Sequence, residues 1–552
     1  MNFNEKIKEN KSSAGIIFLI GCITGAFLFI LTYGVNVLDV TNDGWIFRVS
    51  DVDIHQHYIG WCHFRNSPWT FPLGLMDSLS YPYSMSILWT DSIPLLALVC
   101  KLFRDFLPET FQYFGLYGFF SFSMTGGTAA LLVYKLTRNP LFAVLSVPFI
   151  AESFAMLQRM FYHTSLTAHY LIIIPLLIFL QDSYRWSLKK KCFVWGAYFF
   201  LAVMLHPYLW AMGALIAVFT FIYEIVRNKT FIPALITGAV SALVTYLGLY
   251  ITGAFYGNVD TSYSLVGYSS NLNTFINPLD MSCFLPTLPL QNPNQYEGFA
   301  YLGLGGLILL LFSVLYYALN RKNAEKPDRR HLIFILCPVF FLMSIFPDIT
   351  LNSLLLFRIK IPGSVERILG IFRSNGRFIW PAMILLIVAA VTLFSSCSKK
   401  RLFPAVILVL CLSVQFLDMR EVIISNRKQF IPIGRQWNLD LENEALTAKL
   451  SSYEHIVIVP DDISIMEKVA FFAYKYGLTV NRFYFARNIN DKIEQTLDDY
   501  HRTCTLGDPP DNVIFVFDED SMHSWKEDTD LHFYDLTGTI VGIGDTLPLP
   551  EL

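Results

Sequence analysis

Long apolar segments separated by short basic loops dominate the first three quarters of the chain. About eleven of these segments approach the roughly twenty residues that a helix needs to cross a bilayer. They are residues 14–35, 111–134, 140–158, 165–182, 192–206, 208–226, 231–252, 299–319, 331–346, 378–396 and 402–418. The pattern predicts a polytopic α-helical membrane protein with about 11 transmembrane helices.

The basic residues predict an orientation for these helices. When all the spans are counted, Lys and Arg cluster in short loops on the side of the N-terminus. Cytoplasmic loops carry such an excess, so the N-terminus is expected in the cytoplasm. Three long segments, residues 36–110, 253–298 and 347–377, are then expected outside.

The composition agrees with the membrane class. Of the 552 residues, 54% are hydrophobic and only 15% are charged, which is far from the balance of ordinary soluble proteins. The nine Cys residues show no CxxC pair and no regular spacing. Neither a disulfide framework nor a zinc site is therefore indicated.

Hydropathy falls after the last apolar segment. Two short apolar runs, residues 455–460 and 512–518, have the length and composition of buried strands, with helical stretches between them. We therefore expect a transmembrane domain over residues 1–418 and a small extracytoplasmic α/β domain over residues 419–552.

The most unusual polar stretch, residues 51–61, directly follows the first apolar segment. If it is helical, Asp53 and His57 lie four residues apart on one face, and Gly60 leaves a concavity beside them. Such a pair suits an Asp that takes a proton from an attacking hydroxyl while the His orients it. Asp51 and Asp53 with His55 are alternatively ligands for a divalent cation, Mg or Mn. The residues leave these roles open, together with that of a solvated loop.

Other polar and aromatic residues near the expected outer face are candidates for substrate binding. Aromatic rings stack on the apolar faces of sugars, although Trp and Tyr also gather at membrane interfaces. The candidates are His55, Trp61, Asp91, His163, His206, Tyr296 and Glu297.

The third outer segment is unexpectedly basic for its side of the membrane, with five Lys or Arg residues between positions 358 and 377. Guanidinium groups bind phosphate oxygens through two parallel hydrogen bonds. We therefore expect Arg373 and Arg377, with Asn375 between them, to bind the phosphate of a lipid-linked donor. The alternative is that these Arg side chains reach toward lipid headgroups.

Several short motifs, taken in order, resemble a known group of enzymes. They are DIHQHYIGW at 53–61, FRNSPW at 64–69, FPLG at 71–74, TDSIP at 90–94, EGFAYLGLG at 297–305 and RSNGRF at 373–378. Over roughly residues 45–400 they are similar to a family of bacterial membrane proteins known as DUF6311, grouped with the GT-C superfamily of integral-membrane glycosyltransferases. The resemblance implies an essential acidic residue in the first outer loop, here Asp53 or Asp51.

The resemblance also implies a function. The expected enzyme is a GT-C glycosyltransferase that moves a sugar from a polyprenyl-phosphate donor to a glycan or lipid acceptor of the cell envelope. It is expected in the bacterial cytoplasmic (inner) membrane, with membrane lipids and no nucleic acid as partners. The sequence predicts no definite cofactor, and whether the enzyme needs a divalent cation stays open. One alternative is a polysaccharide polymerase or ligase. A lipid or sugar transporter or flippase is disfavoured because the centres of the spans carry little charge.

Overall fold

The computed structural model describes residues 11–50, 52–257, 265, 267–397, 402–432, 441–487, 489–536 and 538–552. It divides into two compact units, each built from three stretches of the chain. The first unit comprises Met1–Val40, Tyr113–Val244 and Thr261–Pro432, and the second comprises Thr41–Gln112, Thr245–Asp260 and Ile433–Leu552.

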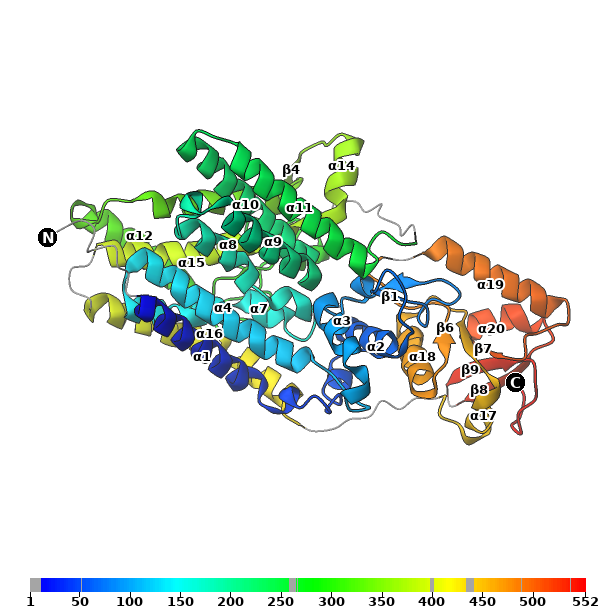
Figure 1. Cartoon of the computed structure of the whole chain (residues 1–552). Coiled ribbons are helices and arrows are strands. Elements are labelled where there is room, and N and C mark those ends of the chain that lie inside the picture. Colours follow the sequence, from blue (N-terminus) through cyan, green and yellow to red (C-terminus); the bar gives the residue numbers. More distant parts are fainter. Residues whose placement is uncertain are drawn as a thin grey trace. The chain divides into compact units, whose positions relative to one another are not determined.

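The first unit is a bundle of helices with one small hairpin (Figure 1). Its helices are α1 (Lys11–Tyr33), α4 (Phe114–Thr137), α5 (Pro140–Leu145), α6 (Val147–Ala151), α7 (Phe154–Arg159), α8 (Tyr170–Leu180), α9 (Leu188–Leu205), α10 (Pro207–Asn228), α12 (Leu304–Asn320), α13 (Leu336–Ile345), α14 (Gly363–Leu369), α15 (Ile379–Ser396) and α16 (Leu402–Phe430). The hairpin consists of β3 (Asp348–Leu351) and β4 (Leu354–Arg358). Helix α11 (Ile232–Thr252) begins in the first unit and ends in the second.

Within the described residues, six helical segments are long and apolar enough to cross a membrane. They are Ser12–Tyr33, Phe114–Thr137, Pro140–Arg159, Pro207–Asn228, Ile232–Thr252 and Asn375–Ser396. Two further apolar helical segments, Thr164–Leu180 and Leu304–Asn320, are shorter. These helices support the membrane class, while the count of about 11 spans and their orientation stay predictions.

Several predicted spans are interrupted in the structure. The apolar run 140–158 folds as three short helices, because Pro148 lies in the first turn of α6 and the Ser153 hydroxyl caps α7 by accepting from the Met156 N–H. The run 331–346 is divided between a 3-10 helix, Arg329–Ile335, and α13. Hydropathy alone does not reveal such breaks, since the residues stay apolar across them.

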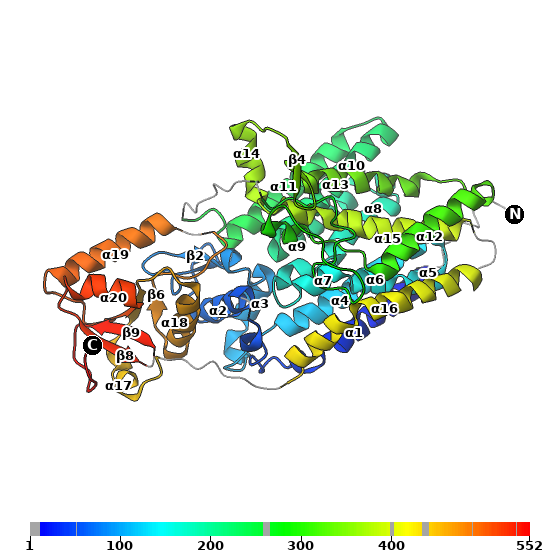
Figure 2. The same cartoon turned by 180° about the vertical axis from the view of Figure 1, so that it is seen from behind.

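Small residues allow the helices of the first unit to pack closely. A Cβ atom on Gly25 of α1 would lie 2.1 Å from the Phe122 carbonyl oxygen of α4, and one on Gly305 of α12 would lie 2.1 Å from the Cys411 carbonyl oxygen of α16. Glycine is therefore required at both crossings. Figure 2 shows α12 and α16 running side by side.

The second unit contains a five-stranded sheet in the order β6-β5-β7-β9-β8. Its strands are β5 (His455–Ile458), β6 (Thr479–Val480), β7 (Val513–Phe517), β8 (His532–Leu536) and β9 (Thr539–Ile543). β5 pairs in parallel with β6 and β7, whereas β9 pairs antiparallel with β7 and β8. The strands predicted near residues 456 and 514 are thus present as the central pair, with Ile456 opposite Ile514.

The helices of the second unit come from both ends of the chain. They are α2 (Val52–Asn66), α3 (Pro94–Leu102), α17 (Glu444–Thr447), α18 (Ile463–Tyr476), α19 (Asn490–Thr505) and α20 (Glu519–Lys526). A two-stranded sheet, β1 (Leu75–Met76) with β2 (Met85–Ser86), lies in the segment between α2 and α3.

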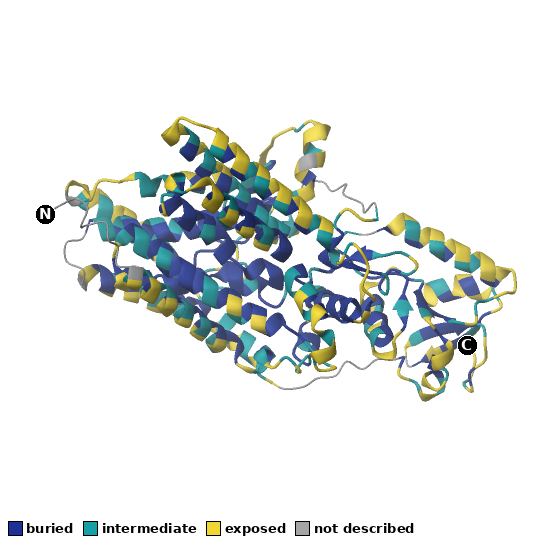
Figure 3. Cartoon of the chain, viewed as in Figure 1, coloured by how far each residue is buried: buried dark blue, intermediate teal, exposed yellow. Residues whose placement is uncertain are grey.

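Helix α2 packs against α18, and Figure 3 shows that most of α2 is buried. The His63 Nε2 lies 2.8 Å from the Ala470 carbonyl oxygen, and the Gln56 side chain donates to the Tyr484 carbonyl oxygen at 2.6 Å. The first outer segment thus forms one unit with the C-terminal sheet. The compact units therefore divide the chain differently from the boundary at residues 418 and 419 predicted from hydropathy, because hydropathy does not register contacts between distant segments.

The burial of His63 predicts a pH-dependent stability of the second unit. Burial lowers the pKa of His63 to about 4, and the bond to Ala470 only partly opposes this. The unfolded chain binds a proton near pH 6.5, so stability is full above that pH and falls as the pH approaches 4. Thermal unfolding at pH 7 and pH 4.5 should show a loss of about 2 kcal/mol from this residue. His63→Gln keeps a donor without titrating, and should remove that part of the pH dependence; an unchanged dependence would contradict the assignment.

Candidate functional site

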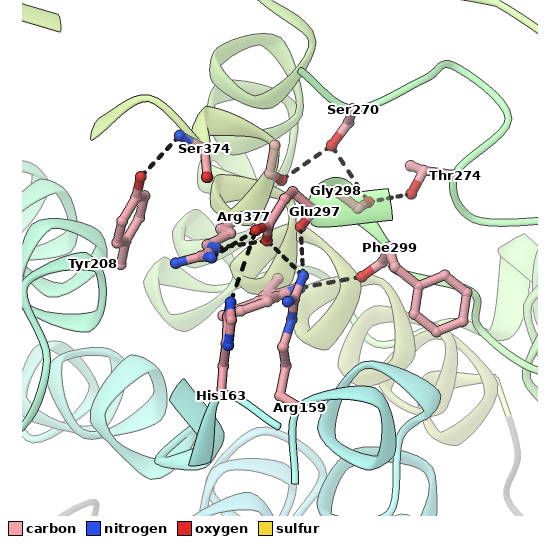
Figure 4. A network of polar contacts seen from close by, with 12 residues as sticks. Arg159, His163, Tyr208, Ser270, Thr274, Glu297, Gly298, Phe299, Ser374 and Arg377 are labelled. Atoms are coloured by element: carbon pink, nitrogen blue, oxygen red, sulfur yellow. Dashed lines mark hydrogen bonds and ion pairs between the residues drawn. The ribbon is translucent and has the colours of Figure 1, made fainter. Parts of the chain in front are cut away.

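Glu297 is the centre of a buried ion-pair cluster in the first unit, drawn in Figure 4. Its carboxylate accepts from Arg377 twice, with Nε to Oε2 at 2.8 Å and Nη2 to Oε1 at 2.7 Å. The Arg159 Nη2 donates to the same Oε2 at 2.6 Å. The His163 Nε2 lies 4.0 Å from Oε1. Two guanidinium groups therefore share one carboxylate.

The three main side chains come from segments far apart in the sequence. Arg159 ends α7, Glu297 lies in the 3-10 helix η7 (Pro293–Gly298), and Arg377 lies in the 3-10 helix η11 (Asn375–Phe378). All three residues are buried. Arg159 was not among the predicted site residues, and the available signal for it was a guanidinium group at the end of an apolar run.

The electrostatics of the cluster fix its charge state. Burial favours the neutral carboxylic acid, but Arg159, Arg377 and His163 together outweigh it and hold the pKa of Glu297 well below its usual range. A buried carboxylate is tolerated only where such partners compensate for its lost hydration. Glu297 is thus an anion that holds two cations in place.

The backbone around the cluster is clamped. A Cβ atom on Gly376 would lie 2.9 Å from the Gly298 Cα, so η7 and η11 approach as closely as glycine permits. The Ser270 hydroxyl donates to the Gly376 carbonyl oxygen at 3.0 Å, and the Thr274 hydroxyl donates to that of Gly298 at 2.5 Å (Figure 4). These bonds hold the two 3-10 helices in register.

The predicted phosphate-binding residues lie in and just before η11. The Arg377 guanidinium is bound to Glu297 and lies 4.7 Å from the centre of the Tyr208 ring. The Asn375 side chain donates to the Met343 carbonyl oxygen at 3.2 Å and to that of Phe346. Asn375 therefore ties η11 to the end of α13.

Arg373 is placed differently from Arg377. Its side chain is half-buried, and its Cζ lies 5.6 Å from the centre of the Tyr268 ring. The neighbouring Ser374 N–H donates to the Tyr208 hydroxyl at 2.8 Å. Its role in binding phosphate stays a prediction.

An apolar cavity of about 530 Å³ lies beside this basic segment. It is lined by Leu265 and by residues of α10, of α13 and of the segment that follows α13. These include Trp210, Ala214, Leu342, Leu369, Phe372, Asn375 and Phe378. Phe372 is a wall residue of the cavity, and Arg373 is the next residue in the chain.

The second unit holds the motif that the sequence singled out. Asp53 lies in the first turn of α2 and is half-buried, whereas His57 is fully buried one turn later. The His57 Nε2 is 3.8 Å from the Asp91 Oδ2. The Ser92 hydroxyl donates to the His57 carbonyl oxygen at 2.6 Å, which fixes the loop against the helix.

The prediction of a concavity beside Gly60 is wrong. A Cβ atom on Gly60 would lie 2.5 Å from the Thr90 side chain, so the loop Thr90–Ile93 fills that space. Asp91 and Ile93 both have positive φ, at 55° and 54°. Such values are unusual for residues other than glycine, above all for a β-branched one, and concentrate at functional sites.

The remaining candidate residues have structural contacts. The His55 Nδ1 lies 2.9 Å from the Glu467 Oε2, and the fully buried Trp61 donates from Nε1 to the Phe111 carbonyl oxygen at 2.9 Å. His206 caps α10, because its Nδ1 accepts from the Tyr208 N–H.

Tyr296 is exposed, and its ring centre is 5.6 Å from the Arg159 Cζ. Three predicted substrate-binding residues therefore lie close together in the first unit: Tyr296, Glu297 and His163. By contrast, Asp53 belongs to the second unit and Arg373 to the first. That these last two share a pocket stays a prediction.

The predicted cation site of Asp51, Asp53 and His55 stays a prediction, because it includes a residue that the structure does not describe. Asp51 lies outside the described residues, and His55 is occupied by Glu467. Among the residues described, no group of three or more His, Cys, Asp or Glu side chains is placed to hold a metal ion.

The ion-pair cluster predicts a large effect of neutralising Glu297. Glu297→Gln leaves two buried guanidinium groups without their anion, and should destabilise the protein by about 3 to 5 kcal/mol. Because the pKa of Glu297 is lowered, its contribution is fully present above about pH 5 and is lost only in stronger acid. Thermal unfolding in detergent at pH 7 measures this effect.

The matched control is Glu421→Gln on α16, whose carboxylate is two-thirds exposed and paired with Arg420. It should change stability by less than about 0.5 kcal/mol. Equal unfolding temperatures for the two variants would show that the Glu297 cluster does not stabilise the fold.

Comparison with solved structures finds a similarity over most of the chain. One similar structure is described as archaeal oligosaccharyltransferase AglB from Archaeoglobus fulgidus in complex with an inhibitory peptide and a dolichol-phosphate. The two chains share 14% sequence identity with a TM-score of 0.43, over 98% of this chain and 75% of that chain. The search of curated proteins found no match.

Comparison with protein families gives a match over both the helical and the C-terminal parts. The family DUF6311, described as a domain of unknown function, matches residues 22–420. The DUF6311 C-terminal domain matches residues 445–544. Because these two matches together cover most of the chain, the protein belongs to the DUF6311 family.

Proposed function

We propose that this protein is a membrane glycosyltransferase that takes a sugar from a polyprenyl-phosphate donor. The acceptor is a hydroxyl of a cell-envelope glycan or lipid, and transfer takes place at the extracytoplasmic face of the bacterial cytoplasmic membrane. The proposal joins the resemblance of the motifs to GT-C enzymes with the chemistry of the residues described above.

The observation that carries the proposal is the apolar cavity beside the basic segment Arg373–Arg377. A lipid phosphate is amphiphilic, so a site for it needs an apolar volume next to cationic donors. The cavity supplies the apolar volume, and Phe372 and Asn375 of its wall flank Arg373 in the chain. An isoprenoid chain in the cavity would bring its phosphate to the level of Arg373.

The Glu297 cluster gives this segment its rigidity. Arg377 is committed to Glu297 and Asn375 to the end of α13. We assign the phosphate contact to Arg373 first, because it directly follows the cavity wall residue Phe372, and give Arg377 and Asn375 the role of holding the segment in place. Arg377 also contributes positive charge close to the departing phosphate.

The proposed reaction is attack of an acceptor hydroxyl on the anomeric carbon of the donor. The new glycosidic C–O bond forms as the bond from that carbon to the phosphate oxygen breaks. Asp53 takes the proton of the hydroxyl, and the lipid phosphate leaves with the bonding electron pair as an anion. Arg373 stabilises the charge that develops on it.

His57 and Asp91 support Asp53 in this proposal. His57 follows Asp53 by one helical turn and lies 3.8 Å from the Asp91 carboxylate. In this proposal the Asp91 carboxylate orients the imidazole, and the imidazole orients Asp53. No step of the proposed reaction is assigned to a cation.

The first test replaces Asp53. Asp53→Asn should reduce transfer of labelled sugar from a polyprenyl-phosphate monosaccharide at least about a thousandfold, because the general base is lost. The fold should stay intact, since Asp53 is only half-buried. Asp105→Asn, in the same segment with its side chain 88% exposed, is the control and should keep full activity. Wild-type turnover by Asp53→Asn would remove Asp53 from the mechanism.

The second test fills the cavity. Ala214→Phe places a ring among the lining residues, and should raise the KM for a long-chain polyprenyl-phosphate sugar at least about tenfold by displacing its apolar chain. The KM for a short-chain, water-soluble analogue should stay unchanged. Val226→Phe, at a largely exposed position on the same helix and outside the cavity, should affect neither donor. An equal effect of Ala214→Phe on both donors would contradict the proposed role of the cavity.

The same assay separates the proposal from its alternative. A monosaccharide transferase turns over a polyprenyl-phosphate monosaccharide, whereas a polymerase or ligase requires a polyprenyl-diphosphate oligosaccharide. Each donor should therefore be assayed separately with the wild-type protein and with the Asp53→Asn variant. Turnover of the diphosphate donor alone would move the assignment to the polymerase or ligase class.

A further inference from the structure

Residues 348–371, from the start of β3 to the second residue beyond α14, form an arm at the margin of the first unit (Figures 1 and 2). Strand β3 fastens the arm to the unit. The Leu272 N–H donates to the Thr350 carbonyl oxygen at 2.9 Å, and the Ser269 hydroxyl donates to that of Asp348 at 3.2 Å. Asp348 and Thr350 are accordingly buried.

Strand β4 is the outer strand of the arm and is exposed along its whole length. Its sequence is Leu-Leu-Leu-Phe-Arg, and all five residues are exposed, Leu354 by 63% and Phe357 by 57%. Successive side chains of a strand point to opposite faces, so both faces of β4 are apolar and uncovered by the described residues. Within the described part of the chain, β4 pairs only with β3.

The helix that follows in the chain also exposes apolar side chains. Val365 and Leu369 of α14 and Ile371 just beyond it are all exposed, and Figure 3 shows α14 mostly in the colour of exposed residues. An exposed apolar strand edge next to an apolar helix is unstable in water and prone to self-association. A partner of apolar character must therefore cover the arm.

The depth of the arm follows from its backbone. A strand with an open edge cannot lie in the hydrocarbon core, where its free N–H and C=O groups would find no hydrogen-bond partner. At the headgroup level, water reaches the backbone while apolar side chains enter the acyl region. The membrane interface is thus the environment that satisfies both the backbone and the side chains of β4.

The charges of the arm identify the headgroups. Arg358, Lys360 and Arg367 are exposed, and Glu366 is the one acidic residue between positions 354 and 371. Arg358 donates to the Asp348 carboxylate, which leaves Lys360 and Arg367 as the basic residues on the outer part of the arm. Basic residues beside an interfacial apolar surface favour anionic lipids.

We propose that residues 354–371 dock into the headgroup region of the bilayer and bind anionic phospholipids through Lys360 and Arg367. Leu369 is both part of this exposed surface and a wall residue of the apolar cavity, so lipid against the arm borders the cavity. The docking does not depend on the proposed glycosyl transfer, and a failure of one leaves the other standing.

The test compares thiol accessibility at three positions in nanodiscs. Leu356→Cys reports the arm, Ile222→Cys on the apolar helix α10 reports the membrane interior, and Leu506→Cys in the polar second unit is the aqueous reference. Each variant is treated with a hydrophilic maleimide, and modification of the peptide that carries the new thiol is followed by mass spectrometry. Only the hydrated thiolate reacts, so the rate reports contact with water.

Interfacial docking predicts an intermediate rate at Leu356→Cys. Labelling should be at least about tenfold slower than at Leu506→Cys, yet measurable, while Ile222→Cys stays unmodified. Leu354→Cys should behave like Leu356→Cys, and it replaces that variant if the latter does not fold. A rate equal to that of Leu506→Cys would overturn the docking, and complete protection equal to that of Ile222→Cys would overturn the interfacial depth.

The lipid preference is tested with the same label. Adding Lys360→Gln and Arg367→Gln to Leu356→Cys should increase labelling several-fold in nanodiscs that contain phosphatidylglycerol. The two added changes should have no effect in nanodiscs of phosphatidylcholine alone. Equal rates with and without them in both lipids would overturn the binding of anionic headgroups.

Discussion

The sharing of the Glu297 carboxylate by two guanidinium groups is the interaction on which the loops of the first unit depend. A buried anion is costly unless cations compensate for its lost hydration, and each cation is equally costly without the anion. Arg159, Glu297 and Arg377 therefore fix one another, and with them the end of α7 and the helices η7 and η11. Because η11 leads directly into α15 and carries two wall residues of the apolar cavity, the shape of that cavity follows from the same ion pairs.

In the second unit, one helix serves both packing and chemistry. On the face of α2 that meets α18, His55 contacts Glu467 and His63 contacts Ala470. Burial lowers the pKa of His63 and keeps it neutral, and His55 is paired with Glu467, so neither is available to a substrate. Asp53 lies at the half-exposed start of the helix, with His57 one turn further along. The crowding of titratable residues that marks this stretch in the sequence therefore has two separate causes.

The sequence predicts those features that depend on neighbouring residues. Apolar runs and the strands β5 and β7 were predictable because hydropathy and strand composition are local. The ion pairs of Glu297 were not, since its partners lie 80 and 138 residues away. The filled space at Gly60 was missed for the same reason, because Thr90 enters it from a loop beyond the next two strands. Motif resemblance recovered the family, yet it gave no information on which polar residues pack against α18.

The joining of α2 to the C-terminal sheet has a consequence for the chain as a whole. Residues 41–112 are made before α18 and the strands that complete their unit. Until then Gln56 and His63 of α2 lack the Tyr484 and Ala470 carbonyl oxygens that they contact in the second unit, so the second unit cannot be completed before these later residues are made. The segment from residue 441 onward is thus an integral part of the same core rather than an appendage, and removing α18 would leave the buried polar groups of α2 without the contacts that α18 supplies.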